Sequence, residues 1–267
     1  MKERYVCNGF SLVELSIVLV ILGLLVGGVL SGQSLIRAAQ LRAVTTEYKR
    51  YYAATQSFRD KYFALPGDMT NATSFWGIAG GTGSDATCQT TVSTDARTCN
   101  GNGDGTVTFS TGSYEYFRFW QHLAAAGLIE GTYTGMTSGA NLYAPGVNIP
   151  VTKLGSNIGW FVYTDATVSG HAFFFDGTNR GRFSVLIPNA AAPYGSYGTM
   201  SPTDTWNIDT KMDDGKPATG SVVSTWGSAF SQSGTSCTTA ASGADLTAIY
   251  VLTNNNTDCT PIFRYQF

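Results

Sequence analysis

A long apolar segment near the start of the chain constrains its fold more than any other feature. A short polar leader, residues 1–9, is followed by residues 10–30, which carry a single charge, Glu14. A run of about 20 apolar residues is long enough to cross the ~30 Å hydrocarbon layer as a helix. The sequence therefore predicts a membrane helix. A carboxylate inside such a helix costs roughly 2 to 4 kcal/mol, so Glu14 is a functional candidate.

The order of the parts differs from that of an ordinary secretory signal. In such a signal the apolar core precedes a cleavage site with small residues and is removed with it. Here a small residue, Gly9, precedes the apolar run. Cleavage after Gly9 would remove the polar leader alone and leave the apolar segment at the new N-terminus.

The stretch Gly9-Phe10-Ser11-Leu12-Val13-Glu14 resembles the class III signal of type IV prepilins and of type II secretion pseudoprepilins. The resemblance implies that a membrane prepilin peptidase cuts after Gly9 and methylates the new amino terminus, Phe10. It also implies that Glu14 pairs with the N-terminal amine of a neighbouring subunit during assembly, and a buried charge is tolerated when it meets an opposite one. A simple signal-anchor helix is the alternative, but it explains neither Gly9 nor the position of Glu14.

The helical pattern continues beyond the apolar run and becomes amphipathic. No proline interrupts residues 10–61, so we expect one helix of about fifty residues, roughly 75 Å long. The resembling family usually has a proline midway along the apolar half, where this chain has Ser31. Pro66 and Gly67 then end the helix.

Four segments follow from this pattern. We expect a leader at 1–9, a transmembrane and assembly helix at 10–32, an amphipathic helix at 33–62 and a soluble α+β domain at 63–267. In that domain we predict helices at about 114–126 and after Ser201-Pro202, and strands at 160–163, 172–175, 183–187, 249–252 and 262–265. The fold class is α+β and, by resemblance, type IV pilin-like, with the long helix packed against a C-terminal antiparallel sheet with loop insertions.

Four cysteines lie beyond the apolar segment, and Cys7 lies in the leader. Their spacing suggests two local disulfides, Cys88 with Cys99 and Cys237 with Cys259, although four cysteines allow three connectivities. Disulfides indicate an oxidising compartment. The formal net charge of −2 gives no support for nucleic-acid binding through a basic face.

The loop from Asn100 to Thr106 has oxygen-bearing side chains at alternate residues and a glycine in sixth place, as in the first half of a calcium loop. Its candidate Ca²⁺ ligands are Asn100, Asn102, Asp104 and Thr106. Position twelve is Thr111 instead of the required glutamate, so a glycine-rich turn is the alternative. A second acidic group, Asp209, Asp213 and Asp214, is either a cation or subunit contact or a solvated helix end.

The sequence offers little for catalysis, since His122 and His171 are its two histidines and no nucleophile elbow or phosphate-binding loop occurs. We therefore expect no enzyme and no certain cofactor. The resemblance to prepilins implies the expected function, a structural subunit of a type IV pilus-like filament. By the same resemblance its partners are related pilins, the prepilin peptidase, the inner membrane and a pilus or secretion assembly platform. The precursor would be a single-pass inner-membrane protein of a bacterium, and the product a periplasmic or cell-surface filament.

Two alternatives remain open at the level of sequence. The chain is also compatible with a type II secretion pseudopilin, or with a minor pilin or adhesin that binds a surface, glycan or DNA. Three aromatic residues are candidates for such binding: Tyr194, Tyr197 and Trp206.

Overall fold

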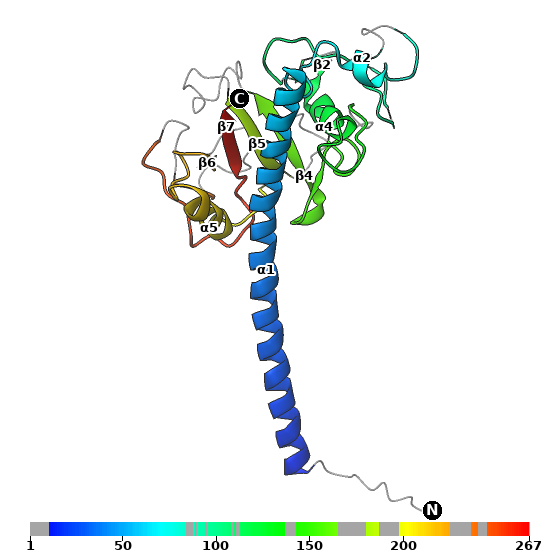
Figure 1. The fold of residues 1–267 in the computed structure, drawn as a ribbon. Helices are drawn as coiled ribbons and strands as arrows, with labels where there is room; N and C mark the ends of the chain where they lie inside the picture. Colours follow the sequence, from blue (N-terminus) through cyan, green and yellow to red (C-terminus); the bar gives the residue numbers. More distant parts are fainter. Residues whose placement is uncertain are drawn as a thin grey trace, which may run out of the picture. The chain divides into compact units, whose positions relative to one another are not determined.

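The computed structural model describes most of the chain and is shown in Figure 1. The described residues are 11–83, 88, 90–93, 95–107, 109–110, 113–136, 143–164, 180–186, 198–224, 236–239 and 245–266. They fall into two compact units, which divide after Arg42. The leader, Phe10, the predicted strand at 172–175, His171, Tyr194 and Tyr197 lie outside the described residues. The predicted domain boundaries stay predictions.

Helix α1, Leu12–Tyr62, is a single helix of 51 residues, which confirms the predicted long helix. It is long and apolar enough to cross a membrane by length and composition, and the most apolar stretch has no buried residues. Every large apolar side chain from Leu12 to Leu30 is exposed. Residues 12–30 therefore leave their apolar surface uncovered.

The α1 residues of the second unit are packed on one side. Tyr51 makes edge contacts with Trp120 and Trp160, at ring centroid distances of 5.0 and 5.6 Å. Tyr48 stacks on Phe263 at 4.7 Å. The Trp160 indole N–H donates a hydrogen bond of 2.8 Å to the Glu47 carboxylate, so the tryptophan is both buried and satisfied. These contacts hold α1 against the sheet.

The sheet has five strands in the order β3-β4-β5-β7-β6, and all neighbouring pairs are antiparallel. Its strands are β3 (Val151–Thr152), β4 (Gly155–Thr164), β5 (Arg180–Leu186), β6 (Val222–Val223) and β7 (Ile262–Gln266). Strands β1 (Phe109–Ser110) and β2 (Ser113–Tyr114) form a separate antiparallel pair. The α+β class is thus confirmed, together with the strands predicted at 160–163 and 262–265. The strand predicted at 183–187 is confirmed as far as residue 186, and residue 187 lies outside the described residues.

The strand predicted at 249–252 is wrong. In this segment Tyr250 makes an isolated bridge with Thr238, and the chain turns at Leu252. Ile249 and Leu252 are exposed, so the apolar run does not pack on the sheet. The segment lies within the loop closed by the disulfide between Cys237 and Cys259, and its backbone bonds go to residues 237 and 239 of that loop.

Two further helices confirm predictions from local signals. Helix α5, Pro202–Met212, has Ser201 as its N-cap, whose hydroxyl accepts from the Asp204 N–H, and proline in its first turn. Helix α4, Glu115–Ala125, is followed by Gly127, whose φ of +72° is typical of an αL cap. A short helix, α2, covers Ala72–Trp76.

Helix α4 is buried on all sides from Glu115 to Leu123, including the polar side chains of Arg118, Gln121 and His122. The segment that contains the first disulfide covers its polar face. The Arg118 guanidinium donates to the Cys88 carbonyl at 3.2 Å, and the Gln121 amide donates to the Arg97 carbonyl at 3.2 Å. A helix can therefore bury polar side chains when a neighbouring loop supplies backbone carbonyls to them.

Candidate functional site

Glu14 lies in the first turn of α1, where its carboxylate caps its own helix. Its Oε2 accepts the Ser11 N–H at 2.9 Å, and the Ser11 hydroxyl accepts the Val13 N–H at 3.3 Å. This reciprocal arrangement is a capping box, which satisfies two backbone donors at the helix start. The sequence Ser-x-x-Glu at residues 11–14 is the signal from which this cap could have been found. Gly9 and Phe10 lie outside the described residues, so their roles stay predictions.

The surface around Glu14 is apolar and exposed on all sides. Glu14 is the single charged residue between residues 11 and 36. Four glycines follow, Gly23, Gly27, Gly28 and Gly32, and a Cβ added at any of them would meet nothing within 4 Å. They form two G-x-x-x-G spacings, which permit helices to approach closely in a membrane. The first unit thus combines a membrane-length helix, one carboxylate and small residues at contact spacing.

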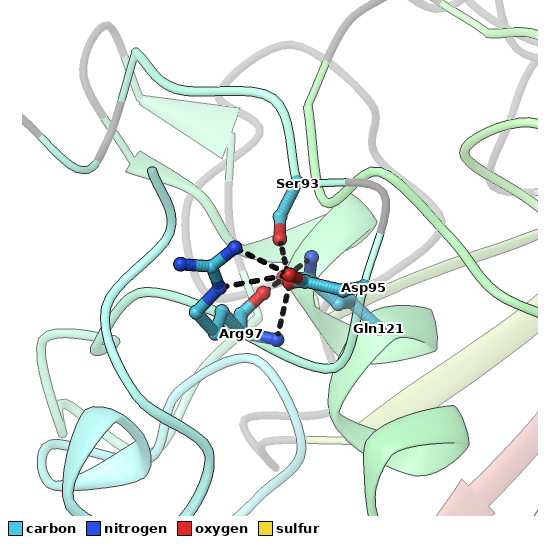
Figure 2. A network of polar contacts seen from close by, with 4 residues as sticks. All are labelled: Ser93, Asp95, Arg97 and Gln121. Carbon is cyan, nitrogen blue, oxygen red and sulfur yellow. Dashed lines mark hydrogen bonds and ion pairs between the residues drawn. The ribbon is translucent and has the colours of Figure 1, made fainter. Parts of the chain in front are cut away.

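Both predicted disulfides are present, Cys88 with Cys99 and Cys237 with Cys259. The first closes a loop that is tied to α4 by the network in Figure 2. The Asp95 carboxylate accepts from the Arg97 guanidinium at 2.8 Å and from the Ser93 hydroxyl at 2.8 Å. The hydrogen bond from Arg97 holds the pKa of Asp95 well below its usual range. The disulfide loop is thus braced internally while Gln121 anchors it to α4.

The predicted calcium loop is organised around a residue that the sequence analysis did not select. The Asp68 carboxylate accepts three backbone N–H groups, from Gly103 at 2.6 Å, Asp104 at 3.1 Å and Gly105 at 2.9 Å. Successive N–H groups that converge in this way form a nest for an anion. Burial raises the pKa of Asp68 despite these bonds. In this structure the loop folds around a carboxylate of the same chain.

Three of the four predicted ligands meet inside the loop, where Asn102 and Thr106 make hydrogen bonds with Asp104. The side-chain oxygen of the fourth, Asn100, accepts from the Thr73 N–H. Carboxylate oxygens of Asp68, Asp104 and Glu115 also lie within 4.8 Å of one another. Glu115 comes too late in sequence to act as the twelfth residue of a calcium loop, but the fold brings it back. Calcium binding at this loop stays a prediction.

The second acidic group is also brought together, with carboxylate oxygens of Asp209, Asp213 and Asp214 within 4.8 Å. The Asp209 carboxylate accepts from the Tyr250 hydroxyl at 2.8 Å and from the Gly215 N–H at 3.1 Å. Burial raises the pKa of Asp209 to about 6. These bonds join the end of α5 to the second disulfide loop, which is a structural role. Trp206, on the same helix, is partly exposed.

His122 is fully buried and both of its ring nitrogens are engaged. Its Nδ1 accepts the Gly67 N–H at 2.9 Å, so Nε2 carries the proton and faces Thr98 Oγ1 at 3.0 Å and the Cys99 carbonyl at 3.2 Å. Burial, together with the nearby Arg118 charge, lowers the pKa of His122 to about 3. The imidazole is therefore neutral at pH 7, and it links the end of α1 to the first disulfide loop.

Comparison with known families decides how the N-terminal region is interpreted. The family model of the prokaryotic N-terminal methylation motif matches residues 4–30. The chain carries the class III prepilin signal of type IV pilins and pseudopilins. No curated protein and no solved structure matches the chain.

The prepilin signal coincides with the exposed apolar part of the first unit. The motif includes Gly9, Phe10 and Glu14 and extends over the most apolar part of α1. It supports a pilin-like or pseudopilin-like protein and a membrane-anchored precursor, and it implies processing by a prepilin peptidase. The prepilin signal ends at residue 30, so the second unit is described by its own fold alone.

Proposed function

We propose that the chain is a structural subunit of a type IV pilus-like filament, cleaved after Gly9, methylated on Phe10 and polymerised through α1. The observation that carries this proposal is the uncovered apolar surface of α1 within a prepilin signal. Such a surface must be covered by lipid in the precursor and by neighbouring helices in the filament. The proposal assigns the chain no catalytic role.

The transfer of α1 from lipid into the filament is driven by helix packing and not by the hydrophobic effect, because lipid tails are as apolar as a neighbouring helix. The glycines at 23, 27, 28 and 32 support this step, since they leave space for a neighbour's backbone. Partners in this proposal are further copies or related pilins, the prepilin peptidase, the inner membrane and an assembly platform. The mature filament would be periplasmic or at the cell surface.

Glu14 supports the proposal through its remaining hydrogen-bonding capacity. A carboxylate has about four acceptor positions, and the Ser11 N–H occupies one of them. The carboxylate can therefore keep its capping bond and still accept from the Phe10 amine of a neighbouring subunit. Because charge-assisted bonds are stronger in a low-dielectric environment, this pair would set the axial register of the subunits.

The test separates the capping role of Glu14 from its charge. Glu14→Gln retains an acceptor for the Ser11 N–H, as glutamine also serves in capping boxes, but it removes the negative charge. We expect Glu14→Gln and Glu14→Ala to be made and cleaved normally and to yield no filaments by electron microscopy of sheared cells. Ser11→Ala is the matched control that weakens the cap and keeps the charge, and it should assemble.

Abundant normal filaments from Glu14→Gln would refute the pairing of Glu14 with a neighbour's amine. Copy number in purified wild-type filaments then separates a main subunit, which should dominate the mass, from a minor pilin or pseudopilin.

A further inference from the structure

Phe63, the residue after the last turn of α1, combines a strained backbone conformation with an exposed aromatic ring. Its φ is +53°, and it is the one described non-glycine residue in this conformation. Helices commonly end with such a residue, but it is usually glycine, because a side chain is strained there. The Phe63 side chain is also 94% exposed, so its ring gains nothing from burial. Strained residues of this kind cluster at binding sites.

Phe63 is one of the residues that line a groove of about 920 Å³. This volume is within the range of small-molecule sites, about 300–1,000 Å³. The groove is formed by the last turns of α1, the turn that follows it and the loop after the first disulfide. Its lining residues are Gln56, Arg59, Asp60, Phe63, Thr70 and Asp68, with Ala64, Leu65, Gly103 and Gly105.

The floor of the groove is preformed. The three N–H bonds from residues 103–105 to Asp68 fix the loop against the turn after α1. Gly101 lies so close to this turn that an added Cβ would stand 2.4 Å from the Asp68 backbone. The disulfide at Cys99 holds the loop from its other end. A rigid floor lowers the entropy cost of binding a ligand.

The rim combines donors, acceptors and one aromatic face. Gln56, Arg59 and Asp60 are spaced three and four residues apart, so they lie on one face of α1. The Arg59 guanidinium contacts the Gln56 side-chain oxygen at 3.4 Å. Guanidinium groups donate, carboxylates accept and amides do both. Beside them the exposed Phe63 ring supplies a flat apolar surface.

We propose that this groove binds a saccharide. A pyranose ring has an apolar C–H face that stacks on an aromatic ring, and hydroxyl groups at its edge that need both donors and acceptors. The groove offers these features together, in an open shape that accepts a sugar within a longer chain. A stable protein partner would instead need a larger contact surface with a fully buried, more apolar core. This inference concerns the second unit and does not depend on filament assembly.

The experiment uses the full-length chain in detergent micelles and an array of immobilised oligosaccharides built from neutral hexoses, N-acetylhexosamines and acidic sugars. We expect the wild type to bind at least one of these classes. Phe63→Gly should reduce that binding by about tenfold, the weight of one aromatic contact. The same variant should unfold at a temperature about 2 °C higher, because glycine adopts the αL conformation without strain.

A loss of binding in a protein of higher stability cannot be attributed to misfolding. Phe75→Ala is the matched control, since Phe75 is exposed, lies close to the end of α1 and does not line the groove. It should bind sugars like the wild type. Asp60→Asn tests the rim and should also weaken binding.

No binding to any sugar class by the wild type, or equal binding by Phe63→Gly, would overturn the proposal. Loss of filaments in Phe63→Gly without sugar binding by the wild type would also overturn it and would assign the groove to a contact between subunits. None of these results would alter the outcome of the Glu14 test.

Discussion

The two ends of helix α1 have the same backbone but opposite surroundings. Between Leu12 and Leu30 the large apolar side chains are exposed, whereas Val44, Tyr51 and Phe58 are buried in the second unit. The first stretch depends on apolar surface in general, so one apolar side chain can replace another. The second depends on particular contacts, such as the bond from Trp160 to Glu47. One helix thus provides a surface for partners and a scaffold for its own domain.

The largest expected effect comes from breaking the scaffold end. Trp160→Ala should lower the free energy of unfolding by about 3–5 kcal/mol, because it leaves a cavity beside Tyr51 and removes the donor to Glu47. Thermal unfolding in detergent, followed by near-ultraviolet circular dichroism, measures it. Leu19→Ala, at the exposed end, is the control and should change stability by less than about 0.5 kcal/mol. Equal effects of the two changes would remove the distinction between the ends.

The next effect concerns the disulfide loop over α4. Replacing Cys88 and Cys99 together with serine should lower the free energy of unfolding by about 3 kcal/mol, since the unfolded chain is no longer constrained. Chemical denaturation with and without reductant measures this loss. An unchanged midpoint would show that the hydrogen bonds from Arg118 and Gln121 hold the loop without the disulfide. Filament assembly should be unaffected if the variant is kept below its unfolding temperature.

A smaller, pH-dependent effect is expected at His122. Its pKa is about 3 in the folded chain, below the ordinary 6.5, so the unfolded chain binds more protons between these values. Stability from this group is complete above pH 6.5 and is lost as the pH falls towards 3, with a loss of about 2 kcal/mol at pH 5. His122→Gln should flatten this dependence, as measured by thermal unfolding from pH 4 to pH 7.

Asp209 acts in the opposite direction, because its pKa is raised to about 6 and its deprotonation destabilises the fold as the pH rises. It is present in both proteins, so it cancels in the difference between the wild type and His122→Gln. The same pH profile in both proteins would contradict the neutral, buried imidazole.

The features that could be predicted from the sequence are those set by local signals. The apolar run, the amphipathic pattern that follows it and the absence of proline predict α1. Ser201-Pro202 predicts the start of α5. The cysteine spacing suggests the two pairs that the structure contains. Each of these signals acts within a few turns or one loop of the chain.

The features that could not be predicted depend on contacts between distant segments. Arg118 and Gln121 of α4 are buried because a disulfide loop supplies their hydrogen-bond partners. Asp68 and Glu115 join Asp104 only because the chain returns to the end of α1. The strained conformation of Phe63 has no sequence signal, since the turn was expected at Pro66 and Gly67.

The central claim is that α1 becomes the N-terminal assembly helix of a processed filament subunit. Mass spectrometry of sheared surface filaments tests it most directly, by reporting the N-terminal peptide. The account predicts a peptide that begins at Phe10 with a methylated amine and lacks residues 1–9. Filaments in which this chain retains its leader, with Met1 or Lys2 at the N-terminus, would contradict it.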